Sequence, residues 1–564
     1  MKRVLLTIAV FAACAIFSSC STIVQYQDEQ EHNINNINMN IYVNDNVIDR
    51  GVTRGGTLNL FTTIPDTLNP VSTRNVFVQS YSGLVFESLV KLQKSQNPLP
   101  VLSDRWSVSQ DGLVWTFHIR ENVKWHDGTP LTAEDVEFTV NEILNGGSGS
   151  IYKSNLQGAT SFGAIDRNNF RIVIGKPNSF QAELMTFPII PKHYFEKYGD
   201  NGLMSGTLPP GTGPYKFESV EKDKVIHLTA NDNWWNASSR GEDSLTLPYI
   251  ENIDVKIYQN PEDALNAFNV KDIDVAFIDF TDIERYKGSI HTSVKTYPSR
   301  NYEFIAFNFN SKVLSDVAVR KAIAYSIDRN QIINDILPGR GIISEIPVIP
   351  GSWLNDANTI SYNVDHNKAR EILAQNGWNE DNGRWSKRID GRREYLSFEL
   401  LVNDENMLRK SVAEEIVQQL KVLGIEVTVV PLKWDEMLEK IESGKYDMAL
   451  MGCTVPQIPD ISFLYATPYL NFITSEGYTG ARNISGYNNP VVDDYVLKIF
   501  SETDNDRKKA LFINMTGLIA DDVPYLGLYF LNNAVMYRKT IRGTIDSHIW
   551  DRYSEITQWY ITEG

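Results

Sequence analysis

The chain has 564 residues, of which 42% are apolar and 22% charged, and its formal net charge is −17 at pH 7. This composition is typical of a globular protein large enough to contain several hydrophobic cores. The negative charge argues against nucleic acid as a partner, because phosphates are bound by basic surfaces.

The N-terminus predicts an exported protein with a lipid anchor. Lys2 and Arg3 precede a largely apolar run, residues 4–17, which is too short to span a membrane and suits a signal peptide. Small residues then lead to Cys20, an arrangement that resembles a bacterial lipoprotein box. Acylation of Cys20 would hold the protein on the outer face of the bacterial cytoplasmic membrane. The alternative is an ordinary signal peptide with an incidental cysteine.

The cysteines favour an exported protein without disulfides. Residues 1–20 are predicted to be the lipoprotein signal peptide. Cleavage before Cys20 would remove Cys14 and acylation would block Cys20, which would leave Cys453 as one free thiol. Residues 21–54 are polar and rich in asparagine, which predicts a flexible tether. We therefore expect no disulfide, no metal ion and no cofactor.

The first third of the mature chain predicts short strands and helices. Leu58 and Leu60 alternate with polar residues as in a strand, and residues 84–92 are predicted to form a helix. Residues 114–120 alternate cleanly, after an Asp-Gly turn that suits a hairpin. A helix is expected to begin at Thr132, in a capping box with Asp135. The positions expected to be buried are Trp115, Phe117 and Ile119 in the strand, and Val136, Val140, Ile143 and Leu144 in the helix.

His126 and Asp127 raise the question of an active site. They stand in the stretch WHDGTP, between the predicted strand and the predicted helix. Side chains adjacent in sequence usually diverge, and Asp-Gly is a turn dipeptide, so we interpret this stretch as a structural turn. No second histidine follows at helical spacing, which argues against a metal site. Gly211 and Gly213 are likewise interpreted as a turn and not as a nucleotide loop.

The second half of the chain predicts strands that alternate with helices. A strand at 397–402 is followed by a helix with Asp404 as its expected cap and Gly424 as its stop. A strand at 425–430, a helix at 434–441 and a strand at 446–452 come next. This order predicts parallel pairing in an α/β lobe. Ligands bind beyond the carboxyl ends of such strands, here at residues 403–406 and 452–460.

Several of these stretches resemble one protein family. WSVSQDGLVWTFHIRENVKWHDGTPLTAEDVEF resembles the signature of the family 5 extracellular solute-binding proteins. GTGPYKF at 211–217, VAVRKAIAYSIDRNQII at 317–333 and YDMALMG at 446–452 follow in the family's order, and the resemblance extends from residue 55 to the C-terminus. It implies an α/β, two-lobed periplasmic-binding-protein-like fold of type II with an extra inserted subdomain. The implied parts are lobe I (55–92, 211–302 and 532–564), the inserted subdomain (93–210) and lobe II (303–531).

The resemblance also implies a function. A receptor of this family binds a small solute between its lobes and delivers it to an ABC importer, so the expected partners are the permease and ATPase subunits. We expect a monomer with no catalytic residues, and not an enzyme. Two alternatives remain: a signalling or adhesion receptor on the same fold, and a secreted hydrolase. A hydrolase would need a nucleophile or paired carboxylates that converge in the cleft.

The ligand is expected to be an oligopeptide, with a non-peptide solute such as an oligosaccharide as the alternative. Peptide-binding members of the family place an aspartate shortly after a Gly-Trp strand end, where it pairs with the ligand's α-ammonium group. In this chain Cys453 follows Gly452, and no acid appears before Asp460. The expected ligand-binding residues are Thr67, Leu68, Asn69, Asp404, Trp434, Tyr446, Met451, Gly452, Cys453, Thr454 and Val455. Trp434 and Tyr446 are candidates for stacking on a sugar, with a packed core position as the alternative, and Cys453 is expected to be a small buried wall residue.

Overall fold

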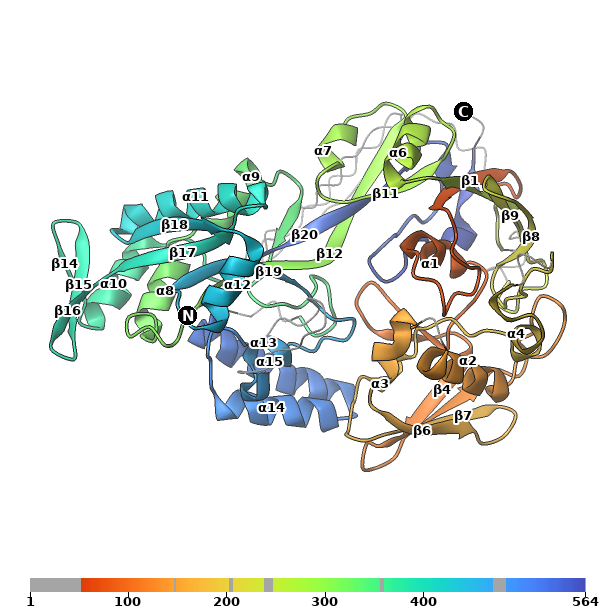
Figure 1. Cartoon of the computed structure of the whole chain (residues 1–564), viewed down its shortest axis with the longest axis horizontal. Helices are drawn as coiled ribbons and strands as arrows, with labels where there is room; N and C mark the ends of the chain where they lie inside the picture. Colours follow the sequence, from red (N-terminus) through yellow and green to blue (C-terminus); the bar gives the residue numbers. More distant parts are fainter. Residues whose placement is uncertain are drawn as a thin grey trace, which may run out of the picture. The chain divides into compact units, whose positions relative to one another are not determined.

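The computed structural model describes residues 52–146, 149–201, 206–237, 247–355, 360–469 and 483–562, which belong to one compact unit that begins at Arg50 (Figure 1). The predicted signal peptide and nearly all of the predicted tether lie outside these residues. Within the described residues, three sheets of four or more strands form the framework, and each is covered by its own hydrophobic core.

The first of these, the β1 sheet, contains the strand predicted at Leu58 and Leu60. Both side chains are fully buried, which confirms that prediction. The C-terminal segment packs into the same core through Tyr553, Ile556 and Trp559. The sheet has the order β1-β10-β9-β8, and its elements and neighbours are β1 (Thr57–Thr63), β8 (Tyr215–Glu221), β9 (Val225–Ala230), β10 (Asn252–Tyr258), α6 (Pro261–Asn269), β21 (Ile541–Arg542), η4 (Ile556–Gln558) and β22 (Tyr560–Ile561).

The helix predicted at residues 84–92 is wrong. Helix α1 (Val76–Ser82) lies earlier, because the Asn75 side chain caps it by accepting a hydrogen bond from the backbone N–H of Phe77 (3.0 Å). A surface helix exposes one face, whereas the residues after α1 are buried at consecutive positions and have no exposed face to present. They fold as a turn and then as β2 (Val90–Leu92), which pairs with β3 (Pro98–Pro100). The buried residues are Leu84, Val85, Phe86 and Leu89.

The second sheet, the β5 sheet, follows the predicted pattern. Trp115, Phe117 and Ile119 are buried on one face of β5, and the Thr132 backbone N–H donates to the Asp135 carboxylate (2.9 Å), as expected for a capping box. Val136, Val140 and Ile143 are buried, and Leu144 is partly buried against the same core. The order is β4-β5-β7-β6, and the elements are β4 (Ser103–Val108), β5 (Val114–Ile119), β6 (Ala159–Ala164), β7 (Asn169–Ile174), α2 (Ala133–Asn145), η1 (Ile151–Leu156), α3 (Gln181–Leu184), α4 (Lys192–Tyr198) and η2 (Gly199–Asn201).

The third sheet, the β12 sheet, is built around two long antiparallel strands, β12 (Thr292–Phe307) and β20 (Tyr525–Arg538). The first half of β12 and the second half of β20 pack into the core of the β1 sheet through Tyr297, Val535 and Tyr537. Their other halves lie in the cores on the two faces of the β12 sheet. Between Pro298 and Tyr302 the register shifts, so that residues 299–301 of β12 face residue 531 alone in β20. The two strands therefore join the core of the β1 sheet to the cores of the β12 sheet.

The parallel part of the β12 sheet confirms the predicted α/β pattern. β17 (Ser397–Asn403) pairs in parallel with β18 (Glu426–Leu432) and with β19 (Met448–Thr454), and α11 (Met407–Leu423) and α12 (Trp434–Glu442) connect them. Gly424 ends α11 with φ +87°, as expected. The predicted cap is wrong: Asn406, not Asp404, accepts the hydrogen bond of the Arg409 backbone N–H (3.0 Å). Residues 404 and 405 form a turn after β17, which places Asn406 directly before the helix.

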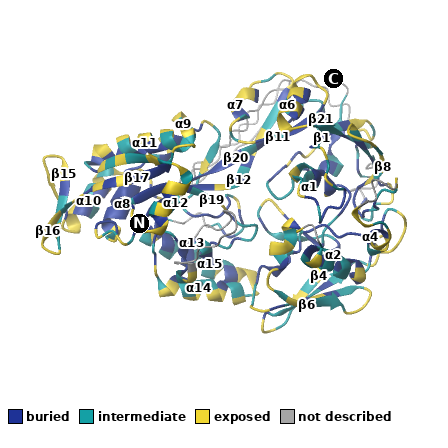
Figure 2. Cartoon of the chain, in the orientation of Figure 1, coloured by how far each residue is buried: buried dark blue, intermediate teal, exposed yellow. Residues whose placement is uncertain are grey.

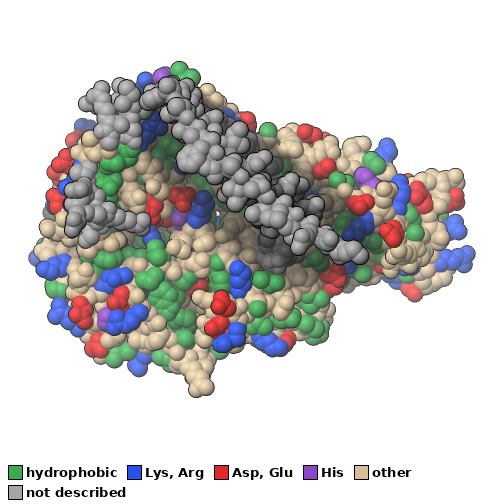
Figure 3. All heavy atoms as spheres, turned by 180° about the vertical axis from the view of Figure 1, so that it is seen from behind, with side chains coloured by type: hydrophobic (Ala, Val, Ile, Leu, Met, Phe, Trp, Pro, Cys, Tyr) green, Lys and Arg blue, Asp and Glu red, His purple; other side chains and the backbone are tan. Residues whose placement is uncertain are grey.

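The remaining elements cover the β12 sheet or extend it. Figure 2 shows its strands largely buried, while exposed residues gather on the outer faces of the surrounding helices. In Figure 3, acidic and basic side chains are interspersed over the face drawn, so the negative charge is not gathered there into a single patch. These elements are β11 (Val275–Ile278), α7 (Ile283–Tyr286), α8 (Val317–Ala324), α9 (Arg329–Asp335), β13 (Gly341–Ile343), α10 (His366–Gln375), β14 (Asn379–Asp381), β15 (Arg384–Ile389), β16 (Arg392–Tyr395), α13 (Ser462–Tyr465), η3 (Thr467–Tyr469), α14 (Pro490–Ser501) and α15 (Asn505–Asp522).

Candidate ligand-binding site

The carboxyl ends of β17 and β19 lie side by side in the β12 sheet, as the α/β pattern predicts. On one side β19 pairs with β12 along its whole length, so that Gly452 faces Glu303 and Cys453 faces Tyr302. On the other side, within the described residues, β19 pairs with β17 only at Met448 and Ala449. The last residues of β19 therefore extend past β17, with one strand edge that no neighbouring strand covers.

A buried ion pair lies above the end of β19. The Arg409 guanidinium, at the start of α11, donates to both carboxylate oxygens of Glu303 on β12, from Nε (2.7 Å) and from Nη2 (2.8 Å). The exposed fractions of the two side chains are 14% and 8%. Arg409 Nη1 also donates to Asn403 Oδ1, at the end of β17 (3.1 Å). The pair thus joins three elements at the edge where a ligand is expected.

Gly452 provides the space that this ion pair occupies. A Cβ atom at Gly452 would overlap with Glu303 Oε1 and would lie 2.6 Å from Arg409 Nη2. The glycine is therefore required by close approach of side chains. Neither Glu303 nor Arg409 was predicted from the sequence. The available signal was the single acid in the apolar strand YEFIAF, because an acid in such a strand must find a buried partner.

The segment after β19 reaches residues of the predicted inserted subdomain. Gln457 Nε2 donates to the Glu183 backbone oxygen and to Thr186 Oγ1 (both 2.6 Å). Gln96 Nε2 donates in turn to the Gln457 backbone oxygen (3.2 Å). Arg300 Nε donates to the Val455 backbone oxygen (2.6 Å). The carboxyl edge of the β12 sheet thus faces the part of the chain that a two-lobed fold would place across the cleft.

The predicted residues at the end of β19 differ in accessibility. The side chains of Met451 and Val455 are buried in the core, Gly452 and Cys453 are half-buried, and Thr454 is exposed. Burial raises the pKa of the Cys453 thiol to about 12, so the thiol is protonated and unreactive near neutral pH. Met451 and Val455 therefore offer a ligand only their backbone.

The predicted Thr67–Asn69 loop is held by hydrogen bonds to near neighbours and by one long-range hydrogen bond. Leu68 is buried in the core of the β1 sheet. The Asn69 side chain accepts from the Val71 N–H (3.0 Å) and donates to Asp200 (2.5 Å), and its backbone N–H donates to Thr67 Oγ1 (3.0 Å). These bonds stabilise the loop itself, and none of them reaches the ends of β17 or β19.

Of the two predicted aromatic residues, Tyr446 lies in the protein core and Trp434 packs against it. Tyr446 is 6% exposed and its hydroxyl donates to the Ile484 backbone oxygen (2.7 Å), so its ring is not available for stacking on a sugar. Trp434 begins α12 and is half-buried against the same core. Asp404 is exposed in the turn after β17. The carboxylate of Asp460 accepts a hydrogen bond from the Ser462 N–H (2.9 Å) and acts locally.

Comparison with known proteins identifies the family. The model of the bacterial extracellular solute-binding proteins, family 5 (Middle), matches residues 97–471. The chain belongs to this family. It is 26% identical to the oligopeptide-binding protein AppA of Bacillus subtilis (strain 168), over 85% of this chain and 87% of that protein. It is 24% identical to the periplasmic oligopeptide-binding protein OppA of Salmonella typhimurium, over 84% and 87% of the two chains.

A solved structure supports the fold. NikZ from Campylobacter jejuni, in complex with Ni(L-His), is similar with a TM-score of 0.59 and 23% identity, over 89% of this chain and 99% of that chain. The predicted two-lobed, periplasmic-binding-protein-like α/β fold is confirmed. Family 5 proteins bind solutes and are not enzymes.

His126 and Asp127 have separate structural partners in this solute-binding protein. His126 Nδ1 accepts from the Gly211 N–H (3.0 Å) and its Nε2 donates to the Gly213 oxygen (3.0 Å). Asp127 instead pairs with His193 Nε2 (2.7 Å). Burial lowers the pKa of His126 to about 4, so the ring is neutral at pH 7. The interpretation of His126–Asp127 as a structural turn is therefore confirmed, and the Gly211–Gly213 stretch is the structural partner of His126.

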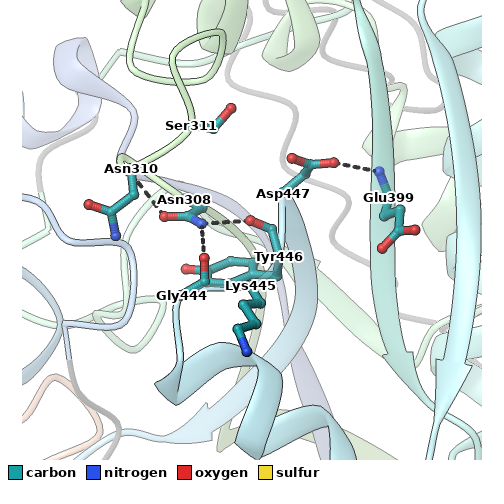
Figure 4. A pocket seen from close by; sticks show the side chains of 8 residues that line it. All are labelled: Asn308, Asn310, Ser311, Glu399, Gly444, Lys445, Tyr446 and Asp447. Carbon is teal, nitrogen blue, oxygen red and sulfur yellow. Dashed lines mark hydrogen bonds between the residues drawn. The ribbon is translucent and has the colours of Figure 1, made fainter.

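A pocket of about 340 Å³ lies at the opposite, amino ends of β17 and β19 (Figure 4). Figure 4 shows the Asn308 side chain between two backbone oxygens, those of Gly444 (3.0 Å) and Tyr446 (2.6 Å). Asp447 accepts a hydrogen bond from the Glu399 N–H (2.9 Å). These bonds fix the turn before β19. Because the pocket lies at the amino ends of the strands, it is distinct from the candidate site at their carboxyl ends. Its lining residues are Asn308, Asn310, Ser311, Glu399, Gly444, Lys445, Tyr446 and Asp447.

The described residues contain neither a metal-binding cluster nor a membrane-spanning helix. No group of three or more histidine, cysteine or acidic side chains among them has an arrangement that could hold a metal ion. Among the helices of the described ranges, none combines the length and the apolar character needed to cross a membrane.

A second connection joins the predicted inserted subdomain to the helices on the β12 sheet. We call residues 178–186 the clasp segment. Ser179 donates from its N–H to the Phe500 oxygen and from its Oγ to the Ile499 oxygen (both 2.8 Å). The ammonium group of Lys508, on α15, donates to the Ser179 oxygen (2.9 Å). Phe180 is fully buried and contacts the Phe500 ring edge-on, with centroids 5.7 Å apart.

The clasp segment makes the stability of the protein sensitive to pH. Burial raises the pKa of Glu183 from its ordinary value near 4.5 to about 7, although Lys508 nearby opposes the shift. Between these values the native state holds a proton that the unfolded state releases, so stability falls as pH rises. Through this group, the free energy of unfolding of the wild type should fall by about 3 kcal/mol between about pH 5 and about pH 8. We expect Glu183→Gln to remove this fall, as measured by chemical denaturation. Glu196→Gln, at an exposed site, should leave the pH dependence unchanged, and an equal slope in Glu183→Gln and the wild type would contradict the assignment.

Proposed function

We propose that this protein is a lipid-anchored substrate-binding protein on the outer face of the bacterial cytoplasmic membrane, which delivers an oligopeptide to an ABC importer. The family match over residues 97–471 carries the proposal, and two relatives named as oligopeptide-binding proteins support a peptide ligand. The permease and ATPase subunits would be its partners, and ATP would be consumed by the ATPase. The anchor would be Cys20, and the receptor would act as a monomer.

The proposed lobes follow the hydrophobic cores. Lobe I would comprise residues 55–92, 211–302 and 532–564, all of which contribute to the core of the β1 sheet. The inserted subdomain, 93–210, would be centred on the β5 sheet, and lobe II, 303–531, on the β12 sheet. Closure of the lobes about β12 and β20 would bury the ligand and exclude water, and the permease would recognise the closed form.

The proposed site is the uncovered edge at the end of β19. An extended peptide can pair with the backbone of Met451–Val455 there as an added strand, because β17 does not cover this stretch. Thr454 is exposed beside this edge, and Asp404 follows the neighbouring strand. We also propose that Trp434 and the Thr67–Asn69 loop contribute to the wall of the ligand site. Tyr446 and Cys453 would shape this wall.

A non-peptide ligand is the second candidate. No acid stands between Cys453 and Pro459, so the residue that would pair with an α-ammonium group in this segment is absent from the sequence. NikZ, which has a similar fold, is in complex with Ni(L-His), so a ligand that is not a peptide is compatible with this fold.

Mass spectrometry of the full-length protein tests the function and the anchor together. The chain would be extracted from membranes in mild detergent, measured intact, and then denatured to release bound molecules. We expect a chain that begins at Cys20 and carries acyl groups, with a heterogeneous set of released peptides. Cys20→Ser is the control, because it should yield an unacylated chain with the same ligands.

The possible outcomes separate the candidates. A single non-peptide mass would favour the second candidate. A wild-type chain without acyl groups would contradict the anchor alone. If nothing is released, the protein would be offered a mixture of short peptides, and failure to capture any of them would contradict peptide binding.

A further inference from the structure

We propose that the hairpin of β15 and β16 binds the acidic headgroups of a lipid bilayer. The contact is made by the basic tip, which we define as Arg388, Arg392 and Arg393. The inference rests on the proposed lipid anchor, which holds the receptor beside a membrane, and it adds a second point of contact. Two points of contact would orient the receptor on the membrane surface.

The basic tip gathers three guanidinium groups without counter-ions. Arg388 on β15 lies directly opposite Arg393 on β16, and Arg392 follows the turn between the two strands. All three residues are exposed, and within the described ranges none of their guanidinium groups forms an ion pair or a hydrogen bond. Like charges directly opposite each other destabilise an antiparallel pair of strands. The tip therefore carries an electrostatic cost that no described residue offsets.

The acids of the hairpin face other cations. Asp390, in the turn, pairs with Lys312. Glu394 lies opposite Lys387 in the ladder, and Lys387 also pairs with Asp316 on the body of the protein (3.0 Å). The acids within reach are thus engaged, and the charge of the basic tip is left for a partner outside the chain.

The base of the hairpin is fixed to the protein. Trp385 is 3% exposed in the core of the β12 sheet, and its indole Nε1 donates to the Leu423 oxygen (2.8 Å). Figure 1 shows the hairpin extending away from the helices that cover this sheet. Because the backbone that carries the basic tip is already ordered, contact with a surface would cost little conformational entropy.

An acidic lipid surface fits the charge of the basic tip. A guanidinium group binds a phosphate group through two parallel N–H···O bonds. The chain as a whole carries a formal charge of −17, so an acidic surface repels most of the receptor and selects the basic tip for contact. As a flexible coil the predicted tether, residues 21–54, would reach about 30 Å, which keeps the receptor close to the bilayer.

Hydrogen exchange on lipid vesicles tests the inference. The full-length acylated protein would be reconstituted on vesicles of phosphatidylcholine alone, or of phosphatidylcholine mixed with acidic phosphatidylglycerol. Exchange would be followed at the turn amides of residues 390–392. We expect exchange there to be slower on the acidic vesicles, on the order of 10-fold. The difference should disappear at about 1 M salt, where the Debye length is about 3 Å.

Two charge-matched variants assign the effect to the basic tip. The first should exchange equally fast on both kinds of vesicle, and its substitutions are Arg388→Gln, Arg392→Gln and Arg393→Gln. The second removes three exposed cations on and beside β7 and should keep the slower exchange of the wild type. Its substitutions are Arg167→Gln, Arg171→Gln and Lys176→Gln. The comparison of the two lipid compositions needs the wild type alone, so it decides even if a variant does not fold.

The outcomes separate the basic tip from the anchor. Equal exchange of the attached wild type on both kinds of vesicle would overturn the inference and leave the anchor intact. Slower exchange only on membranes that contain the permease would assign the tip to an acidic protein and would also overturn it. A chain that does not attach to phosphatidylcholine vesicles would contradict the anchor, whereas slower exchange on the acidic vesicles would still support the basic tip.

Discussion

Replacing Glu345 with alanine is expected to lower the free energy of unfolding of the protein by about 3–5 kcal/mol. Glu345 pairs with Arg329 (2.5 Å), whose side chain is 3% exposed. Arg329 also donates to the oxygens of Gly527 (3.0 Å) and Tyr362 (2.9 Å), so the guanidinium is fixed and cannot turn to solvent. Glu345 further accepts from the Tyr362 N–H (3.0 Å). The alanine variant would leave a buried cation without its counter-ion.

Chemical denaturation with two further variants isolates this cause. Asp494→Ala removes one partner of the exposed pair with Lys498, in which both side chains are 56% exposed, and should change stability by at most about 0.5 kcal/mol. The double variant Arg329→Met/Glu345→Leu removes both charges and should recover most of the loss. A loss below about 1 kcal/mol in Glu345→Ala would show that the cation finds another partner or reaches water.

Replacing Phe180 with alanine is expected to lower the free energy of unfolding by about 3–5 kcal/mol and to loosen the contacts of the clasp segment with α14 and α15. The ring of Phe180 is fully buried in the core of the β12 sheet, although the residue belongs to the predicted inserted subdomain. It contacts the Phe500 ring, and the Lys508 ammonium lies 4.7 Å from its centroid. Its removal would leave a cavity between the two parts of the chain. Hydrogen exchange should become faster at the Ser179 amide, which donates to Phe500.

Phe187→Ala is the matched control for this variant. Phe187 is equally buried, but it lies within the core of the β5 sheet. Its removal should lower stability by a similar amount without faster exchange at Ser179. If Phe180→Ala leaves exchange at Ser179 unchanged, the hydrogen bonds of the clasp segment hold the contact without the ring.

The sequence predicted features whose cause lies within a few residues. The strand with Trp115, Phe117 and Ile119, and the capping box of Thr132 and Asp135, depend on local periodicity and local hydrogen bonds. The helix at residues 84–92 was predicted wrongly because a short apolar run has no period that separates a buried turn and strand from a helix. Only the partners of those residues in the folded core decide between the two.

The candidate site could be predicted in part. The alternation of strands and helices predicted the parallel order of β17, β18 and β19, and parallel strands bind ligands at their carboxyl ends. The Glu303–Arg409 pair could not be foreseen, because 106 residues separate the two side chains. They meet only through the register of β12 with β19 and the position of α11. Long-range pairing of this kind leaves almost no trace in a single sequence.

The register shift of β12 has a mechanical consequence. Where residues 299–301 face residue 531 alone, the ladder to β20 is interrupted, and a ribbon of two strands bends most easily where its rungs are missing. Arg300 and Glu303 stand inside or directly beside this gap. Flexure of the ribbon would therefore shift the Glu303–Arg409 ion pair at the carboxyl edge of the β12 sheet. The point at which the ribbon bends and the ion pair at the edge of the proposed site would then belong to one stretch of backbone.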